Sequence, residues 1–137
     1  MPDSGHKRVL VVDDERVIAD TLSKILRQKG LDAIAVYSAE DALALMPDWI
    51  PDFAFLDVYL PGMNGIDLAL RLKADYPRCQ VTLISALHST LEKLDEARLQ
   101  GHSLPLLEKP FHPTVMLGLV GEFNTSGAGV PLRVELR

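Results

Sequence analysis

Short apolar runs alternate with segments of helical periodicity through most of the chain. The run Val9–Val12 is continuously apolar, as expected for a strand that is buried on both faces of a sheet. After it, apolar residues from Ile18 to Leu26 recur at the spacing of an amphipathic helix. The alternation predicts five strands, at residues 9–12, 32–37, 53–56, 81–85 and 104–107.

Turn and capping residues delimit five predicted helices. Gly30 suits the left-handed position that follows the first helix. Ser38 is a favourable N-cap for the second, with Asp41 at its third position. Pro113 suits the first turn of the fifth. The helices are predicted at residues 15–29, 39–46, 66–76, 91–100 and 113–123.

The fifth predicted helix has an unusual composition. Val115, Leu119 and Phe123 share one face, while Gly118 and Gly121 fall inside the helix. Each glycine costs about 1 kcal/mol relative to alanine in a helix interior. Two explanations stay open: close packing against a neighbouring element, or a pliable helix that binds a partner.

The alternation of strands and helices predicts an α/β fold, a doubly wound, five-stranded parallel sheet with helices on both faces. Pro105 lies inside the fifth strand and cannot donate to a ladder, so this strand is expected at an edge. The flavodoxin-like strand order 2-1-3-4-5 meets that condition. The domain is expected to span residues 7–123, and residues 124–137 to form a flexible tail or linker remnant.

Composition narrows the possible functions. The 137-residue chain has a formal net charge of −5 and no visible basic patch, so direct binding of nucleic acid is not expected. No apolar run approaches the roughly 20 residues that span a membrane, and residues 1–8 lack the apolar stretch of a secretory signal. Together with a single cysteine, Cys79, these features favour a cytoplasmic protein without membrane contact.

Polar residues stand where the predicted strands end. Asp13 and Asp14 follow the first strand, Asp57 the third and Lys109 the fifth, while Ser85 ends the fourth. In a doubly wound sheet these positions converge on the ligand-binding edge. Two carboxylates about 4 Å apart repel by roughly 4 kcal/mol at an effective dielectric constant near 20, so cations must compensate. Lys109 supplies one charge, and an oxygen-only ligand set favours Mg²⁺ for the rest.

Each of these residues has a simpler explanation when taken alone. An aspartate can cap a helix or stabilise a loop, a serine can end a strand, and a lysine is usually solvated. Their convergence on one edge of the sheet makes a shared chemical site the stronger interpretation.

The ordered set of motifs resembles the receiver domain family of two-component signalling. The resemblance covers about residues 7–123; each motif alone is weak, and the ordered set is specific. The matching segments are Val9–Val12 with Asp13-Asp14-Glu15, Ser38–Leu43, Asp57 with Leu60–Gly65, Ser85-Ala86 and Lys109-Pro110-Phe111.

The resemblance implies a role for each site residue. Asp57 is expected to accept the phosphoryl group and, with Asp14 and the carbonyl of Tyr59, to bind Mg²⁺ directly. Asp13 is expected to act mainly through bound water. Ser85 is expected to hydrogen-bond the phosphoryl group, and Lys109 to pair first with Asp57 and then with a phosphoryl oxygen. The Lys109–Pro110 peptide bond is expected to be cis.

The resemblance also implies partners. The phosphodonor is expected to be a histidine kinase or a histidine phosphotransfer protein that docks near Val17 and Phe111. The output is expected to pass to an unknown protein or to a removed output domain. Tyr59 and Leu87 flank the approach of the water that hydrolyses the phosphorylated state, so self-dephosphorylation is expected to be slow. The family's usual aromatic residue before the lysine is replaced by Leu106, which leaves the route of the signal open.

Two other functions compete with this interpretation. A pseudo-receiver that never carries phosphate is compatible with Leu106, although the complete acidic set argues against it. A phosphatase of the haloacid dehalogenase kind requires an Asp-x-Asp motif, whereas Asp13 and Asp14 are adjacent. The chain is therefore expected to be a switch with no enzyme activity beyond self-phosphorylation and slow self-dephosphorylation.

Overall fold

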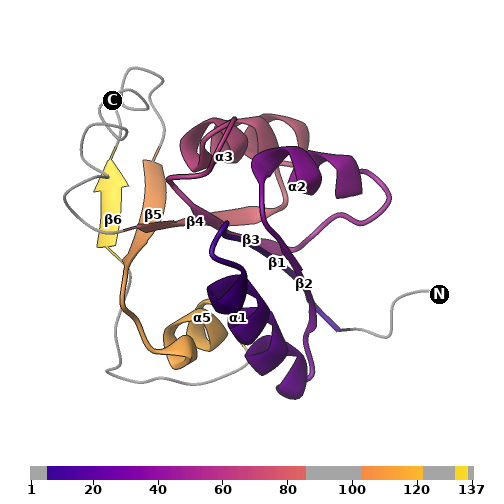
Figure 1. Ribbon diagram of the computed structural model, residues 1–137, viewed down its shortest axis with the longest axis vertical. Helices are drawn as coiled ribbons and strands as arrows, with labels where there is room; N and C mark the ends of the chain where they lie inside the picture. The colour runs from indigo at the N-terminus through magenta and orange to yellow at the C-terminus, as the bar shows by residue number, and fades with distance from the viewer. Residues whose placement is uncertain (1–5, 86–102, 122–131, 136–137) are drawn as a thin grey trace.

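The sheet at the centre of the molecule has six strands in the order β2-β1-β3-β4-β5-β6 (Figure 1). The computed structural model describes residues 6–85, 103–121 and 132–135. Its elements are β1 (Arg8–Val12), α1 (Arg16–Gln28), β2 (Asp32–Val36), α2 (Ala39–Leu45), β3 (Phe53–Asp57), α3 (Gly65–Asp75), β4 (Gln80–Ser85), β5 (Ser103–Glu108), α5 (Pro113–Val120) and β6 (Leu132–Glu135).

The first five strands are parallel and confirm the predicted order 2-1-3-4-5. β6 was not predicted: it pairs antiparallel with β5, so that Leu106 lies opposite Leu132. The prediction that β5 is an edge strand is therefore wrong. Pro105 lies opposite Arg133 in this ladder. A proline removes one N–H donor but keeps its carbonyl, so a short partner strand still pairs along the rest of β5.

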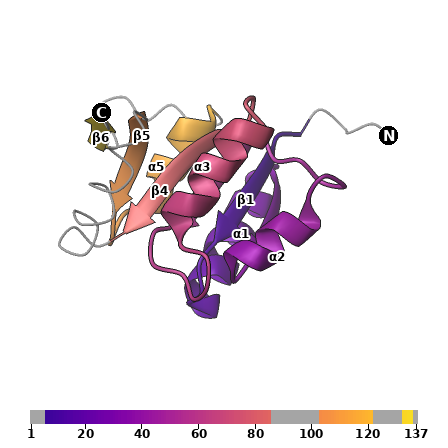
Figure 2. The same cartoon turned by 90° about the horizontal axis from the view of Figure 1, so that it is seen from above.

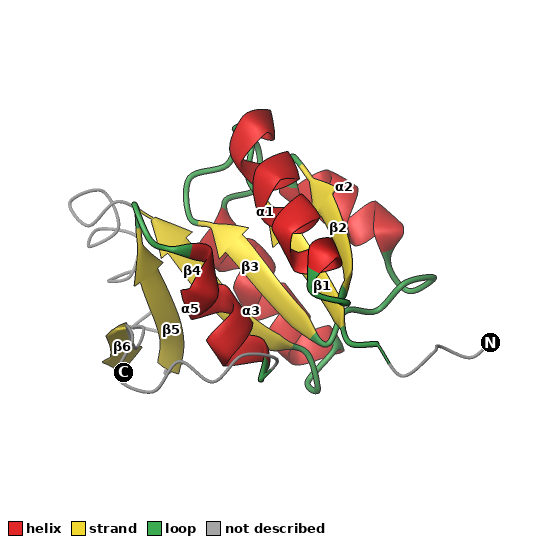
Figure 3. Ribbon diagram, turned by 90° about the horizontal axis from the view of Figure 1, so that it is seen from below, coloured by secondary structure: helices red, strands yellow, loops and turns green. Residues whose placement is uncertain are grey.

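Helices cover both faces of the sheet. Figure 2 shows α2 and α3 over one face, and Figure 3 shows α1 and α5 over the other. Along β1 the side chains alternate between the two layers: Leu10 and Val12 pack with the α2–α3 layer, and Val9 and Val11 with the α1–α5 layer. All four are fully buried, which confirms the prediction of a strand covered on both faces.

Local signals at the helix ends are confirmed for α1 and α2. The backbone N–H of Asp41 donates to Ser38 Oγ at 3.0 Å. Gly30, which follows α1, has a φ of 88°, a conformation that glycine adopts without steric cost.

The fifth helix is shorter than predicted. α5 ends at Val120, and Gly121 adopts a φ of 86° just beyond it, so Gly121 stops the helix and is not an interior glycine. Gly118 does lie inside α5. The buried residues of the helix are Met116, Leu117 and Val120, while Val115 and Leu119 of the predicted face are partly buried and pack against the same core.

Several predicted features lie outside the described residues. The predicted fourth helix, Leu87 and Ala86 fall within residues 86–102, and Phe123 falls within residues 122–131. Among the helices that the structure describes, none has the length and apolar character needed to cross a membrane.

Candidate functional site

The site is built where β1, β3 and β5 end. In the parallel pairing of β1 with β3, Val12 lies opposite Leu56, so Asp13 and Asp57, the next residues along the two strands, reach the same edge. Lys109 directly follows β5, and its backbone N–H donates to the Ser85 carbonyl at 3.0 Å. The convergence predicted from the strand ends is present.

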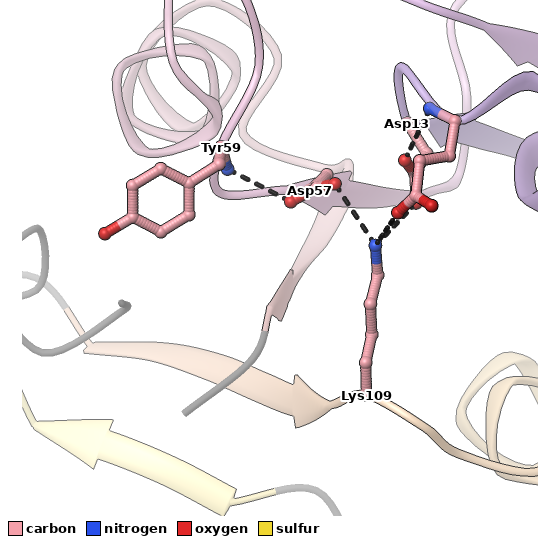
Figure 4. A network of polar contacts seen from close by, with 5 residues as sticks. Asp13, Asp57, Tyr59 and Lys109 are labelled. Atoms are coloured by element: carbon pink, nitrogen blue, oxygen red, sulfur yellow. Dashed lines mark hydrogen bonds and ion pairs between the residues drawn. The ribbon is translucent and has the colours of Figure 1, made fainter. Parts of the chain in front are cut away.

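Lys109 is the cationic centre of the site (Figure 4). Its Nζ lies 3.0 Å from Asp13 Oδ2 and 3.2 Å from Asp57 Oδ2. It also lies 3.4 Å from Glu15 Oε1, a contact that was not predicted. The acidic run that continues from Asp13 to Glu15 was the sequence signal for this third carboxylate.

Burial shapes the electrostatics of the site. Asp13 is 0% exposed and Asp57 is 6% exposed. Burial, followed by the negative charge of Asp13, raises the pKa of Asp57 to about 6, although hydrogen bonds from the Tyr59 N–H and from Lys109 oppose the rise. Burial disfavours the charge on Lys109, but the hydrogen bonds and charges of Asp13 and Asp57 outweigh it, so its pKa is raised and the ammonium stays charged.

Asp13, Asp14 and Asp57 form a group that fits a metal ion. Each offers one carboxylate oxygen, and these oxygens lie within 4.8 Å of one another. Asp14 is exposed to solvent, whereas the other two are buried. The donors are all hard oxygen atoms, which suits a divalent cation of the magnesium or calcium type.

The backbone after Asp57 is held tightly. The N–H of Tyr59 donates to Asp57 Oδ1 at 3.0 Å, and the Tyr59 ring points away from Lys109 in Figure 4. The N–H of Gly65 donates to the Val58 carbonyl at 2.9 Å. A Cβ at Gly65 would lie 1.9 Å from the carbonyl oxygen of Asp57, so glycine is required for α3 to begin this close to the strand.

Ser85 and the lysine–proline bond lie where the sequence predicts them. Ser85 ends β4, is 2% exposed and lies opposite Glu108 of β5. The Lys109–Pro110 peptide bond is cis, as expected.

The predicted partner residues differ in exposure. Val17 is 79% exposed, whereas Leu106 is 1% exposed and belongs to the core on the α2–α3 side. Phe111 is partly buried and lines a pocket of about 240 Å³ beside Lys109. The other residues that line this pocket are Ile18, Leu22, Ile84 and Pro110.

Comparison with known proteins supports the resemblance. The family model for the response regulator receiver domain matches residues 9–120 of this chain. The chain belongs to the response regulator receiver family. This membership, with the adjacent Asp13 and Asp14, sets aside the haloacid dehalogenase alternative.

Similar proteins share the domain at moderate identity. The DNA-binding response regulator MtrA of Mycobacterium tuberculosis is 32% identical over 118 residues, which cover 86% of this chain and 50% of that protein. The chain thus spans about half the length of the curated relatives it matches. A CheY-like receiver domain protein of Methanospirillum hungatei has a TM-score of 0.75 at 26% identity, over 86% of this chain and 93% of that one. The receiver domain of NtrX from Brucella abortus has a TM-score of 0.68 at 35% identity, over 83% and 94%.

Proposed function

We propose that this receiver domain is a phosphorylation-dependent switch in which Asp57 accepts a phosphoryl group from a histidine kinase or a histidine phosphotransfer protein. The observation that carries the proposal is the contact of a buried Asp57 with Lys109, 3.2 Å away, beside the acidic group of Asp13 and Asp14. In this arrangement a nucleophilic carboxylate, a fixed cation and a cluster of metal-binding oxygens meet at one edge of the sheet.

The chemistry is a displacement at phosphorus. An oxygen of Asp57 forms a bond to the phosphorus atom, the bond from phosphorus to the donor histidine nitrogen breaks, and the electron pair leaves with the imidazole. Lys109 neutralises negative charge on the transferred group, and the Ser85 hydroxyl donates a hydrogen bond to it. The chain would therefore contribute mainly alignment and charge. It would have no enzyme activity beyond self-phosphorylation and slow self-dephosphorylation.

The acidic group would hold Mg²⁺. Asp14, Asp57 and the carbonyl of Tyr59 are the proposed direct ligands, and Asp13, whose oxygens already bind Lys109 and the Glu15 N–H, is the proposed ligand through water. The ion would supply positive charge beside the phosphoryl oxygens, which a single lysine does not balance.

Phosphorylation of Asp57 is tested with a small donor. Incubation with acetyl phosphate and Mg²⁺ is expected to add one phosphoryl group to the intact protein by mass spectrometry. Asp57→Asn and wild type with a chelator in place of Mg²⁺ serve as controls and are expected to show no addition. A wild-type protein that gains no phosphoryl group, or an Asp57→Asn protein that gains as much, would overturn the proposal.

The partners are part of the same proposal. The kinase or phosphotransfer protein would dock over Val17 and Phe111, beside Lys109, in the cytoplasm. The output would pass to an unknown protein or to an output domain in a longer chain, since the curated relatives are about twice as long. The domain itself, with its net charge of −5, would not bind nucleic acid directly.

Tyr59 and Leu87 would flank the water that hydrolyses the phosphorylated state. Tyr59 is 39% exposed.

One observation favours a second candidate, a pseudo-receiver that works by binding alone. Leu106 is buried in the core and has no aromatic ring that could respond to the Ser85 hydroxyl. A pseudo-receiver would bind its partner equally well as wild type and as Asp57→Asn, with or without acetyl phosphate. A phosphorylation switch requires that wild type and Asp57→Asn differ in partner binding after treatment with acetyl phosphate.

A further inference from the structure

The loop between β3 and α3 makes a contact with α2 that lies outside the acidic site. Glu40 stands in the first turn of α2, and its Oε2 accepts a hydrogen bond of 3.0 Å from the backbone N–H of Met63. The two residues are 23 positions apart, so this bond links α2 to the loop that follows Asp57. Charged hydrogen bonds of this kind are stronger than neutral ones.

Gly62 lies close against the same carboxylate. Its φ of 73° lies in the left-handed region, and a Cβ at this position would lie 2.6 Å from Glu40 Oε2. A side chain here would both strain the backbone and collide with Glu40. The hydrogen bond from Met63, followed by one from the backbone N–H of Glu40 itself, lowers the pKa of Glu40, so the carboxylate is charged at neutral pH.

The two ends of the loop are attached separately. At its start the N–H of Tyr59 donates to Asp57 Oδ1, and at its end the N–H of Gly65 donates to the Val58 carbonyl. The bond to Glu40 holds the middle. The peptide that carries the Tyr59 carbonyl lies between these attachments, so its orientation depends on how the middle of the loop is held.

We infer that Glu40 is a positioning residue for the phosphorylation of Asp57. It holds the β3–α3 loop against α2 and thereby fixes the Tyr59 carbonyl, the proposed backbone ligand of Mg²⁺. Glu40 is exposed and is not one of the three clustered aspartates, so it acts through the loop and not by touching the phosphoryl group. The inference rests on the proposed function and deepens it.

The test compares Glu40→Ala, Glu40→Gln and Asp48→Asn with wild type. Glu40→Gln keeps an acceptor oxygen without the charge, and Asp48→Asn removes one exposed charge just after α2. Glu40→Ala is expected to weaken Mg²⁺ binding about three- to tenfold by calorimetry. The reason is that part of the free energy of the charged hydrogen bond stabilises the loop conformation that binds Mg²⁺. Its phosphorylation by phosphoramidate should fall more at low Mg²⁺ than at saturating Mg²⁺. Glu40→Gln should lie between Glu40→Ala and wild type, because a neutral acceptor makes a weaker hydrogen bond, and Asp48→Asn should stay within about twofold of wild type.

Several outcomes separate this inference from the proposed function. A wild-type protein that takes no phosphoryl group overturns the function. A wild type that is phosphorylated, beside a Glu40→Ala protein with equal Mg²⁺ affinity and rate, overturns the positioning role. A Glu40→Ala protein that is less stable in urea but unchanged in Mg²⁺ affinity also overturns it, because Glu40 would then be structural alone.

Amide exchange gives a second readout that does not depend on phosphorylation. Linkage is reciprocal, so if the loop contact favours Mg²⁺ binding, Mg²⁺ must favour the contact. Mg²⁺ is expected to slow hydrogen exchange of the Met63 amide in wild type and to have no effect on it in Glu40→Ala. Equal protection of Met63 with and without Mg²⁺ in wild type would overturn the inference.

Discussion

Lys109 lies within 3.4 Å of Asp13, Glu15 and Asp57, so one positive charge faces three negative ones. Asp13 is fully buried and Asp57 nearly so, which weakens the screening of their repulsion by water. The raised pKa of Asp57 has the same origin, because burial and the charge of Asp13 disfavour its ionised form. At the scale of single residues, a further cation would reduce the repulsion among these carboxylates.

The two neighbouring aspartates are expected to contribute unequally to Mg²⁺ binding. Both oxygens of Asp13 are engaged, Oδ2 by Lys109 and Oδ1 by the Glu15 N–H at 3.0 Å, whereas Asp14 is exposed. Asp14→Ala is therefore expected to weaken Mg²⁺ binding at least about tenfold, and Asp13→Ala less. Titration calorimetry measures both. A larger loss in Asp13→Ala would contradict the assignment of Asp14 as the direct ligand.

Cys79 gives a prediction that is independent of the site. Burial, followed by the charge of Asp52, raises the pKa of the Cys79 thiol to about 12. In the unfolded chain the thiol ionises near pH 9, so the folded state binds the proton more tightly and the unfolding free energy falls as the pH rises above about 9. Between pH 8 and pH 10, wild type is expected to lose about 1.4 kcal/mol of unfolding free energy more than Cys79→Ala, measured in urea. If the unfolding free energy of the two proteins falls equally between pH 8 and pH 10, the prediction is refuted.

The residues of the site were predictable to different degrees. Asp57 and Lys109 follow apolar runs, and the rule that parallel strands end at one edge places them together without coordinates. Glu15 and Glu40 were not assigned roles, because their contacts join positions 94 and 23 residues apart. Both are exposed acidic residues near a helix start, where a solvated carboxylate is the ordinary expectation.

At the scale of elements, periodicity predicted the strands that are buried on both faces and failed at β6. β6 has four residues, Leu132–Glu135, in which apolar and charged residues alternate, and its pairing with β5 is a long-range event that no local pattern reports. The end of α5 was misplaced for a related reason. A glycine at position 121 fits an interior site and a left-handed stop equally well until packing decides between them.

Two glycines offer a test of how closely α3 is joined to the strand that bears Asp57. Gly65 has a negative φ but no room for a Cβ, which would lie 1.9 Å from the Asp57 carbonyl oxygen. Gly30 has a φ of 88° and nothing within 4 Å of its Cβ position. Gly65→Ala is expected to cost about 3 kcal/mol or more and to slow phosphorylation, because the strand end must move. Gly30→Ala should cost about 1 kcal/mol through backbone strain and leave phosphorylation unchanged.

Urea unfolding and phosphoramidate kinetics measure the two glycine variants side by side. If Gly65→Ala is no less stable than Gly30→Ala, then α3 does not begin in fixed contact with the end of β3.

At the scale of the whole molecule, the acidic site opens beside an apolar surface. Ile18, Phe111 and Lys109 line the pocket of about 240 Å³, and Val17 projects into solvent from the start of α1. We expect a protein that brings a phosphohistidine to Asp57 to cover part of this surface, whereas a small donor such as acetyl phosphate need not. Leu106 lies away from this surface, enclosed in the core on the opposite face of the sheet.

Val17 separates the docking of a protein donor from the chemistry at Asp57. It is 79% exposed and is the second residue of α1, where an aspartate also favours the helix dipole, so Val17→Asp should fold normally. Transfer from the cognate kinase is expected to fall at least about tenfold, because a charge replaces an apolar contact at the interface. Phosphorylation by acetyl phosphate should be unchanged, and Val17→Ala should show a smaller loss with the kinase. Equal transfer to wild type and Val17→Asp would place the kinase on another surface, and an equal loss with both donors would show that the substitution disturbs the site itself.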